Sequence, residues 1–232
     1  MKIAAISDIH GNLYALMKAF EDIDSQNVDL IVCLGDLVGY GPHPNEVIAL
    51  IRRRNIPTIK GNYDASVVDG DFTFIRDTSI NSFSLPFAVG EVRESNKYYL
   101  DSLPTELNYE FNGVKLKFTH GSPNAINEYL FENGTNTKNV MESLDSDILV
   151  CAHTHIPSFK KFENKTYINV GSIGKPKIGR PNITYSIIEI NEEGKSKVHF
   201  RELEYDKHKI IKDCQMLNFP NALIESYKSG AE

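Results

Sequence analysis

The chain has 232 residues, of which 41% are hydrophobic and 24% charged, with a formal net charge of −6. These values are ordinary for a globular protein with a substantial core, and the negative charge offers no general basic field for a nucleic-acid backbone. No apolar run reaches the roughly 18 residues of a membrane-spanning helix. The N-terminus shows no signal-peptide pattern and the three cysteines are widely spaced, so we expect a cytoplasmic protein without a membrane partner.

The first third of the chain alternates between strand and helix patterns. Apolar strands are predicted over 2–6, 29–34 and 56–60, and amphipathic helices over 12–26 and 45–54. This order favours parallel βαβ units.

The first strand leads directly into Asp8 and His10. On extended backbone their side chains should point the same way, because side-chain direction repeats every second residue in a strand. We therefore expect both residues to face one site.

A helical pattern follows over 67–104, which Pro86 and Gly90 should interrupt and Pro104 should end. The segment is rich in aromatic residues. It suits a partial cover over a site, or a helical layer that packs on a sheet, which is the commoner use of aromatic residues.

The second half of the chain reads mainly as hairpins, the first of them around the turn Asn112-Gly113. A helical tail is expected over 206–232. We predict a single domain over 1–232, in which a parallel first half and an antiparallel second half form two sheets packed face to face, with helices outside. The predicted strands are 107–111, 114–118, 147–152, 158–162, 165–169, 183–190 and 197–203, with a helix over 136–144.

Potential metal ligands recur where these strands end, which is where open α/β sheets place their ligand sites. Imidazole, carboxylate and amide groups without a thiolate suit manganese, iron, zinc, cobalt or nickel, of which Mn²⁺ or iron is preferred here. Seven ligands are too many for one tetrahedral ion but would serve two divalent ions that share a carboxylate. The residues are Asp8, His10, Asp36, Asn62, His120, His153 and His155.

The order and spacing of these motifs resemble the calcineurin-like metallophosphoesterases, above all their small bacterial and archaeal single-domain members. The resemblance implies an α/β fold, a four-layer α/β/β/α sandwich of two mixed sheets. The loop 35–42 is typical of one branch, in which some members hydrolyse dinucleoside polyphosphates. The motifs are Asp8-x-His10, Gly35-Asp36, Gly61-Asn62-x-Asp64, Thr119-His120-Gly121 and Ala152-His153-Thr154-His155.

The resemblance also implies a role for each position. Asp8, His10 and His155 would hold the first ion, and Asn62, His120 and His153 the second, with Asp36 bridging both. The catalytic set would be Asn62, Tyr63, Asp64 and His120, and substrate would meet Asn62, Tyr63, Gly171 and Ser172. Their places in nearby loops make His43 and Arg180 further candidate substrate contacts.

Tyr63 departs from the family pattern, where a histidine often contacts the phosphate and assists the leaving group. Tyrosine, with an ordinary pKa of about 10, is a weaker proton donor at neutral pH. His43 could replace the lost acid or be a plain loop residue. Lys175, Lys177 and Arg180 could meet substrate phosphates or form a solvated basic loop.

The predicted function is a two-metal phosphoesterase that cleaves a phosphoanhydride or phosphodiester by attack of a metal-bridging hydroxide. Its partner would be a small phosphate ester or nucleotide, such as a dinucleoside polyphosphate. A broad-specificity phosphodiesterase or phosphomonoesterase and a non-catalytic metal-bearing scaffold stay open as alternatives, as does a homo-oligomer. A nuclease is disfavoured, because no basic stripe is visible.

Overall fold

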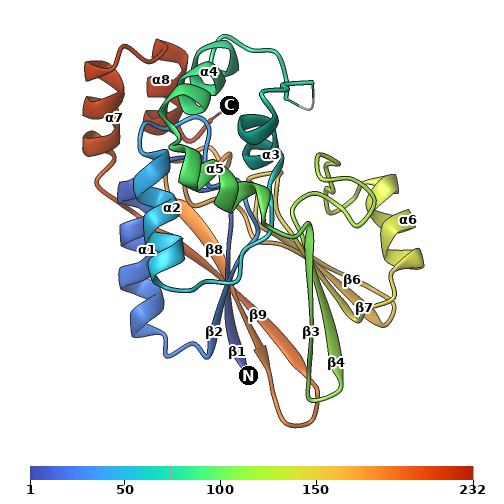
Figure 1. Cartoon of the computed structure of the whole chain (residues 1–232). Coiled ribbons are helices and arrows are strands. Elements are labelled where there is room, and N and C mark those ends of the chain that lie inside the picture. The colour runs from blue at the N-terminus through green and yellow to red at the C-terminus, as the bar shows by residue number, and fades with distance from the viewer. Residues whose placement is uncertain (74, 232) are drawn as a thin grey trace.

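The computed structural model describes residues 1–73 and 75–231, and Figure 1 shows the arrangement of its helices and strands. The strands are β1 (Lys2–Ile6), β2 (Leu30–Cys33), β3 (Glu106–Phe111), β4 (Val114–Thr119), β5 (Ile148–Cys151), β6 (Ser158–Phe162), β7 (Lys165–Asn169), β8 (Ile183–Ile190) and β9 (Ser196–Leu203). The helices are α1 (Leu13–Ser25), α2 (Pro44–Arg53), α3 (Asn62–Asp69), α4 (Asn81–Glu91), α5 (Glu94–Asp101), α6 (Thr135–Ser143), α7 (Lys207–Met216) and α8 (Asn221–Ser229).

Two mixed sheets form the centre of the molecule, as predicted. One has the strand order β2-β1-β8-β9, and the other has the order β3-β4-β5-β7-β6. The expected split into a parallel first half and an antiparallel second half is wrong. Strand β8 returns from late in the chain to pair antiparallel with β1, while β5 pairs parallel with both β4 and β7.

Side-chain alternation along the strands sorts the apolar residues into three layers. On β1, Ala4 and Ile6 face α1 and α2, whereas Ile3 and Ala5 face the other sheet. On β5, Ile148 and Val150 point between the sheets, and Leu149 and Cys151 pack with Val140 and Met141 of α6. The result is helices, sheet, sheet and helix in succession (Figure 1).

Two predicted elements differ in the structure. Residues 56–60 make a single bridge, Cys33 to Thr58, rather than a strand, because Pro57 has no N–H to donate to a ladder. Helix α4 runs through Pro86 and Gly90, which were expected to interrupt it. Pro86 removes only the hydrogen bond to the carbonyl of Ser82, and Ser82 is exposed to water, which can replace that bond.

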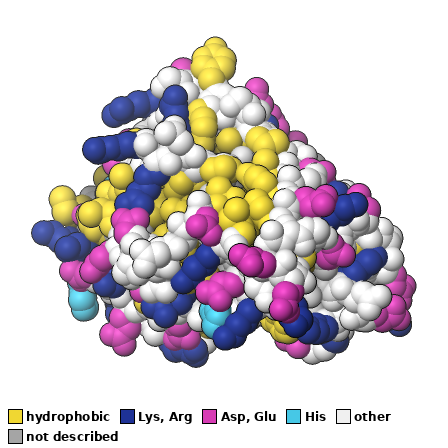
Figure 2. All heavy atoms as spheres, turned by 90° about the horizontal axis from the view of Figure 1, so that it is seen from below, with side chains coloured by type: hydrophobic (Ala, Val, Ile, Leu, Met, Phe, Trp, Pro, Cys, Tyr) yellow, Lys and Arg dark blue, Asp and Glu magenta, His cyan; other side chains and the backbone are white. Residues whose placement is uncertain are grey.

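Figure 2 views the molecule from below, the end at which β1 begins. Hydrophobic side chains gather in the middle of this face, with charged ones around them. The core between the sheets keeps partly buried apolar side chains at its margin, on β2, β3, β4 and β9. Among the described residues, no helix is both long and apolar enough to cross a bilayer.

Replacing Phe118 with alanine should lower the free energy of unfolding by about 3–5 kcal/mol, since the ring is fully buried between the sheets. Phe159→Ala is the matched control, because that phenylalanine is 38% exposed on β6. Urea unfolding of both variants measures the difference. Equal losses would contradict the assignment of Phe118 to the central core.

Candidate metal centre

Seven potential ligand side chains meet at the end of the sheets opposite the face in Figure 2. Four loops supply all but one of them, namely the loops that follow β1, β2, β4 and β5. The remaining ligand is the first residue of α3. Each of the seven is at most 6% exposed, so the group is shielded from water. They are Asp8, His10, Asp36, Asn62, His120, His153 and His155.

The backbone at these positions is unusual. Strand β1 ends at Ile6, and Asp8 and His10 both have positive φ, of 52° and 49°. Their convergence therefore comes from a turn of the chain and not from extended backbone, as the sequence pattern had suggested. Asp36, His153 and His155 also lie in the left-handed region, which is uncommon for residues other than glycine.

The ligand atoms form two groups, each able to hold an ion: Asp8, His10 and His155, and Asp36, His120 and His153. In the first, Oδ1 of Asp8 lies 3.2 Å from Nε2 of His155 and 3.6 Å from Nε2 of His10. In the second, Oδ2 of Asp36 lies 3.3 Å from Nε2 of His120. The same Oδ2 is also 3.6 Å from Nε2 of His10, so Asp36 stands between the groups.

Backbone carbonyls fix the orientation of three imidazole rings. Nδ1 of His10 faces the carbonyl of Val38 at 3.0 Å, and Nδ1 of His120 faces that of Leu34 at 2.7 Å. Nδ1 of His155 lies 2.5 Å from the Lys175 carbonyl. A carbonyl oxygen only accepts, so each Nδ1 carries a hydrogen, and each ring, in its neutral form, would present a lone pair at Nε2, as metal-binding histidines do.

These lone pairs face one another. Nε2 of His10 and Nε2 of His155 are 3.3 Å apart, and Oδ1 of Asp8, Oδ2 of Asp36 and Nε2 of His153 are buried without a hydrogen-bond partner among the described residues. Buried acceptors without donors are costly. A divalent cation is the group that would satisfy all of them, so the residues fit the metal ions implied by the motifs.

The ionisation of the centre follows the same pattern. Burial would raise the pKa of Asp8, but the neighbouring histidines, His155 first, hold it well below its usual value. Burial would also lower the pKa of His120, but the carboxylates of Asp36 and Asp8 raise it to about 10. Burial lowers the pKa of His153 to about 3. At neutral pH and without a metal, carboxylates, a protonated His120 and a neutral His153 thus share one enclosed space.

Asp64 organises this centre and does not line its cavity. Its two carboxylate oxygens accept hydrogen bonds from the backbone N–H groups of Asp36, Leu37, Val38 and Gly61, at 2.8–3.3 Å. Burial and the nearby Asp36 charge raise the pKa of Asp64 to about 6, against these four donors, which favour the carboxylate. Asp64 thereby fixes the loop that holds Asp36 and the Val38 carbonyl.

Ser172 and Gly174 also support the site from behind. The Ser172 hydroxyl donates to the Asp8 carbonyl at 2.9 Å, and the N–H of Gly174 donates to the same carbonyl at 2.8 Å. A Cβ on Gly174 would lie 1.8 Å from the Ile9 carbonyl oxygen, so only glycine allows this approach. Both Gly171 and Ser172 are buried and lie outside the lining of the cavity.

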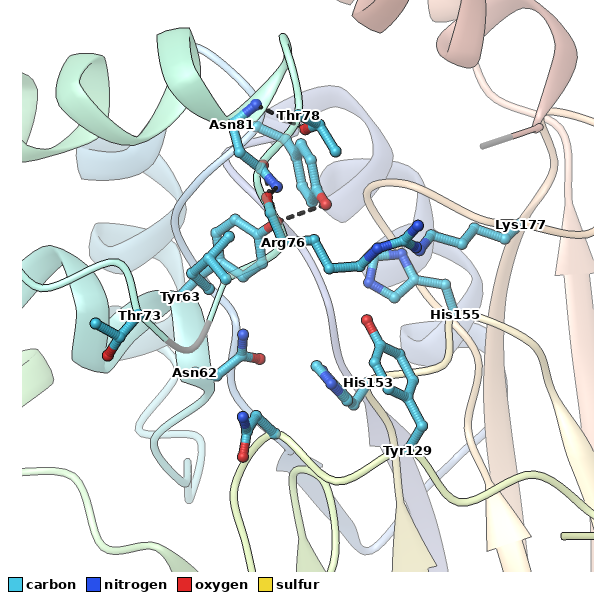
Figure 3. Close-up of a pocket in the computed structure, with 13 residues that line it drawn as sticks. Asn62, Tyr63, Thr73, Arg76, Thr78, Asn81, Tyr129, His153, His155 and Lys177 are labelled. Atoms are coloured by element: carbon cyan, nitrogen blue, oxygen red, sulfur yellow. Dashed lines mark hydrogen bonds between the residues drawn. The ribbon is translucent and has the colours of Figure 1, made fainter.

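A cavity of about 300 Å³ opens over the ligands, with Asn62, His153 and His155 in its wall (Figure 3). Tyr129 also lines it and stacks on His153, with ring centroids 4.1 Å apart. Part of the opposite wall is the loop between α3 and α4, through Arg76. Other aromatic side chains of the region, such as those of Phe83 and Phe87, pack on the helical side of the first sheet.

The Tyr63 hydroxyl is committed to neighbouring residues. It lies 2.9 Å from Oδ1 of Asn81 and 2.5 Å from the Tyr40 hydroxyl. Because Oδ1 only accepts, Tyr63 gives its proton to Asn81 and receives one from Tyr40. Burial raises the pKa of Tyr63 well above its usual value. The ring lines the cavity, but its proton is already engaged by Asn81.

Besides Gly171 and Ser172, two further predicted substrate contacts lie outside the cavity lining. Nε2 of His43 bonds Asp213 of α7 at 2.9 Å, and Arg180 pairs with Glu202 of β9, so neither lines the cavity. Of the nearby lysines, Lys177 lines the cavity, while Lys175 is buried with Nζ 5.0 Å from the Tyr40 ring centroid. Arg76, Asn81, Asn127 and Tyr129 were not identified as cavity residues from the sequence, since they follow no motif.

Comparison with known proteins agrees with this geometry. Residues 1–193 match a family described as the calcineurin-like phosphoesterase superfamily domain. The chain is 33% identical over 96% of its length to the uncharacterized protein MJ0912 of Methanocaldococcus jannaschii, of which it covers 96%. It is 24% identical over 83% of its length to the phosphodiesterase YfcE of Escherichia coli K12, of which it covers 94%. The crystal structure of a metallophosphoesterase from Sphaerobacter thermophilus superposes with a TM-score of 0.84, at 26% identity, covering 100% of this chain and 99% of the other.

Asp64→Asn should weaken metal binding by about 10- to 100-fold, a typical cost of losing a supporting partner of a ligand. The amide turns an NH₂ group toward N–H donors that now meet a carboxylate oxygen, so the Asp36 loop loses its anchor. Titration calorimetry with Mn²⁺ measures the change. Asp69→Asn, an exposed aspartate on the same helix, is the control, and equal affinities in the two variants would contradict this role.

Proposed function

Since the chain belongs to the calcineurin-like phosphoesterase superfamily and is a metal-dependent hydrolase, we propose that it uses two divalent ions to cleave a phosphoanhydride or phosphodiester bond. The preferred substrates are nucleotides or dinucleoside polyphosphates. The observation that carries the proposal is the pair of buried ligand groups, with Asp36 between them, at the base of a cavity.

In this proposal Asp8, His10 and His155 hold one ion, and Asn62, His120 and His153 hold the other. Oδ1 of Asp36 already accepts the N–H of Tyr63 at 2.8 Å, so Oδ2, which has no hydrogen-bond partner among the described residues, is the oxygen left available to the ions. The bound ions would lower the pKa of water and neutralise charge on the phosphoryl group. Mn²⁺ or iron suits this nitrogen and oxygen donor set.

The protein's own groups would position the substrate. Asn62, His153 and His155 form the part of the cavity wall beside the ligand groups, so the scissile phosphoryl group would lie against them. The Asn62 amide could then donate to a phosphoryl oxygen from Nδ2, because its Oδ1 faces Nε2 of His120 at 3.0 Å. Positioning of this kind supplies a large part of catalysis in phosphoryl transfer.

The leaving group receives little proton assistance in this arrangement. The proton of Tyr63 is given to Asn81, and His43 lies against Asp213, outside the cavity wall. An alkoxide leaving group needs a proton, whereas a leaving phosphate or nucleotide is already stable as an anion. This supports phosphoanhydrides and activated esters as substrates over simple alkyl monophosphates.

Removal of metal should abolish hydrolysis of bis(p-nitrophenyl) phosphate, and added Mn²⁺ should restore it. Asp36→Asn removes the shared charge between the two ligand groups, so we expect kcat to fall by roughly 10²- to 10³-fold. Release of p-nitrophenol is the measurement, with Asp69→Asn as the surface control. Absence of turnover with manganese, iron, cobalt, nickel and zinc alike would favour a non-catalytic scaffold.

Tyr63→His should raise kcat for an alkyl monophosphate by about 10-fold or more, because imidazole can protonate an alkoxide at neutral pH. Glycerol 3-phosphate, assayed by released phosphate, is a suitable substrate. Tyr98→His, at a position 75% exposed on α5, is the matched control. An unchanged rate with glycerol 3-phosphate would show that the leaving-group argument is wrong.

A further inference from the structure

The wall of the cavity beyond the ligand groups contains two cationic side chains. Arg76 and Lys177 both line it, and none of the described residues that line it is an aspartate or glutamate. The chain as a whole carries a net charge of −6, so this concentration of positive charge is local. Low-dielectric walls strengthen such a field and favour anionic ligands.

The two cations come from different parts of the chain and approach the cavity together. Figure 3 shows the Arg76 side chain reaching from the loop between α3 and α4 towards Lys177 and His155. The N–H of Lys177 donates to the His155 carbonyl at 3.2 Å, which fixes its backbone to the loop of a proposed metal ligand. The cations therefore stand next to the place where the scissile phosphoryl group would lie.

Asn81 holds Arg76 in place from the other direction. Its Nδ2 donates to the Arg76 carbonyl at 2.8 Å, while its Oδ1 accepts the Tyr63 hydroxyl at 2.9 Å. Asn81 is 4% exposed, and its N–H donates to Oγ1 of Thr78 at 3.1 Å. Tyr63 follows Asn62 on α3, so one buried amide connects the Arg76 loop to the helix that carries a proposed ligand.

We propose that Arg76 and Lys177 bind a second phosphate of the substrate, the neighbour of the one that is attacked, and that Asn81 is the positioning residue for Arg76. This inference rests on the proposed function and narrows it to substrates with two or more linked phosphates. A guanidinium can contact phosphate oxygens through two parallel hydrogen bonds, and an ammonium adds a point charge.

The size of the cavity agrees with this substrate class. A volume of about 300 Å³ is at the lower end of the range for ligand pockets, roughly 300–1,000 Å³. It would enclose linked phosphates and leave part of a dinucleotide outside. Selectivity would then come from the phosphate chain and not from a closed pocket for each nucleoside.

Arg76→Ala should lower the ratio of kcat/KM for diadenosine tetraphosphate to that for bis(p-nitrophenyl) phosphate by about 10- to 100-fold, the usual effect of losing charge-assisted hydrogen bonds. Lys177→Ala should lower the ratio by a smaller factor. The ratio for Arg76→Lys should lie between those of the wild-type protein and Arg76→Ala. Arg53→Ala, an exposed arginine on α2, is the control that should leave both rates unchanged.

A binding measurement separates recognition from catalysis. In calorimetry, Arg76→Ala should bind imidodiphosphate, a non-hydrolysable pair of linked phosphates, more weakly than the wild-type protein does. Its affinity for inorganic phosphate should be unchanged. In the wild-type background, Asn81→Ala should lower the ratio of kcat/KM for diadenosine tetraphosphate to that for bis(p-nitrophenyl) phosphate. Added to Arg76→Ala, it should not change this ratio further, because both substitutions remove the same interaction with the second phosphate. A purely structural role for Asn81 would lower both rates together and leave the ratio unchanged.

The outcomes distinguish the two levels of the proposal. If the wild-type protein hydrolyses neither bis(p-nitrophenyl) phosphate nor diadenosine tetraphosphate with any of the divalent ions, the proposed function fails. If it hydrolyses both, and Arg76→Ala lowers both equally or neither, only the second phosphate site is overturned. Hydrolysis of bis(p-nitrophenyl) phosphate without any of the tetraphosphate would overturn the second phosphate site as well.

Discussion

The convergence of hydrogen-bond acceptors is the constraint on which the rest of the site depends. Imidazole nitrogens and carboxylate oxygens from widely separated residues point into one buried space, and backbone carbonyls hold three of the rings so that they cannot turn away. Such an arrangement is unfavourable without a cation and favourable with one. Folding therefore prepares a site in which metal binding supplies the missing interactions.

Holding these acceptors together requires a second set of interactions behind them. Five of the ligand residues have positive φ, which costs free energy at each non-glycine position. Asp64 offsets part of this cost by accepting four backbone N–H groups, and Ser172 and Gly174 both bind the Asp8 carbonyl. The residues nearest the chemistry are thus positioned by others that do not line the cavity.

Much of the fold could be predicted because local patterns and tertiary packing agree. The Asn112-Gly113 turn and the alternating strands around it gave the β3–β4 hairpin in its observed place. Sequence could not show that Pro57 leaves a single bridge or that α4 continues through Pro86, since both depend on which backbone groups face water. The ligand groups lie in motifs at strand ends, whereas Arg76 and Asn81 reach the cavity through a loop whose position only tertiary contacts determine.

The antiparallel pairing of β1 with β8 has a kinetic consequence. The loop carrying Asp8 and His10 follows β1, yet the groups that bind its backbone, at Ser172 and Gly174, belong to a segment just before β8. Closing a chain of that length costs more entropy than forming a local hairpin, and contacts between distant residues slow folding. A nascent chain can build helices α1 and α2 early, but the loop after β1 gains this support only once most of the sequence has been synthesised.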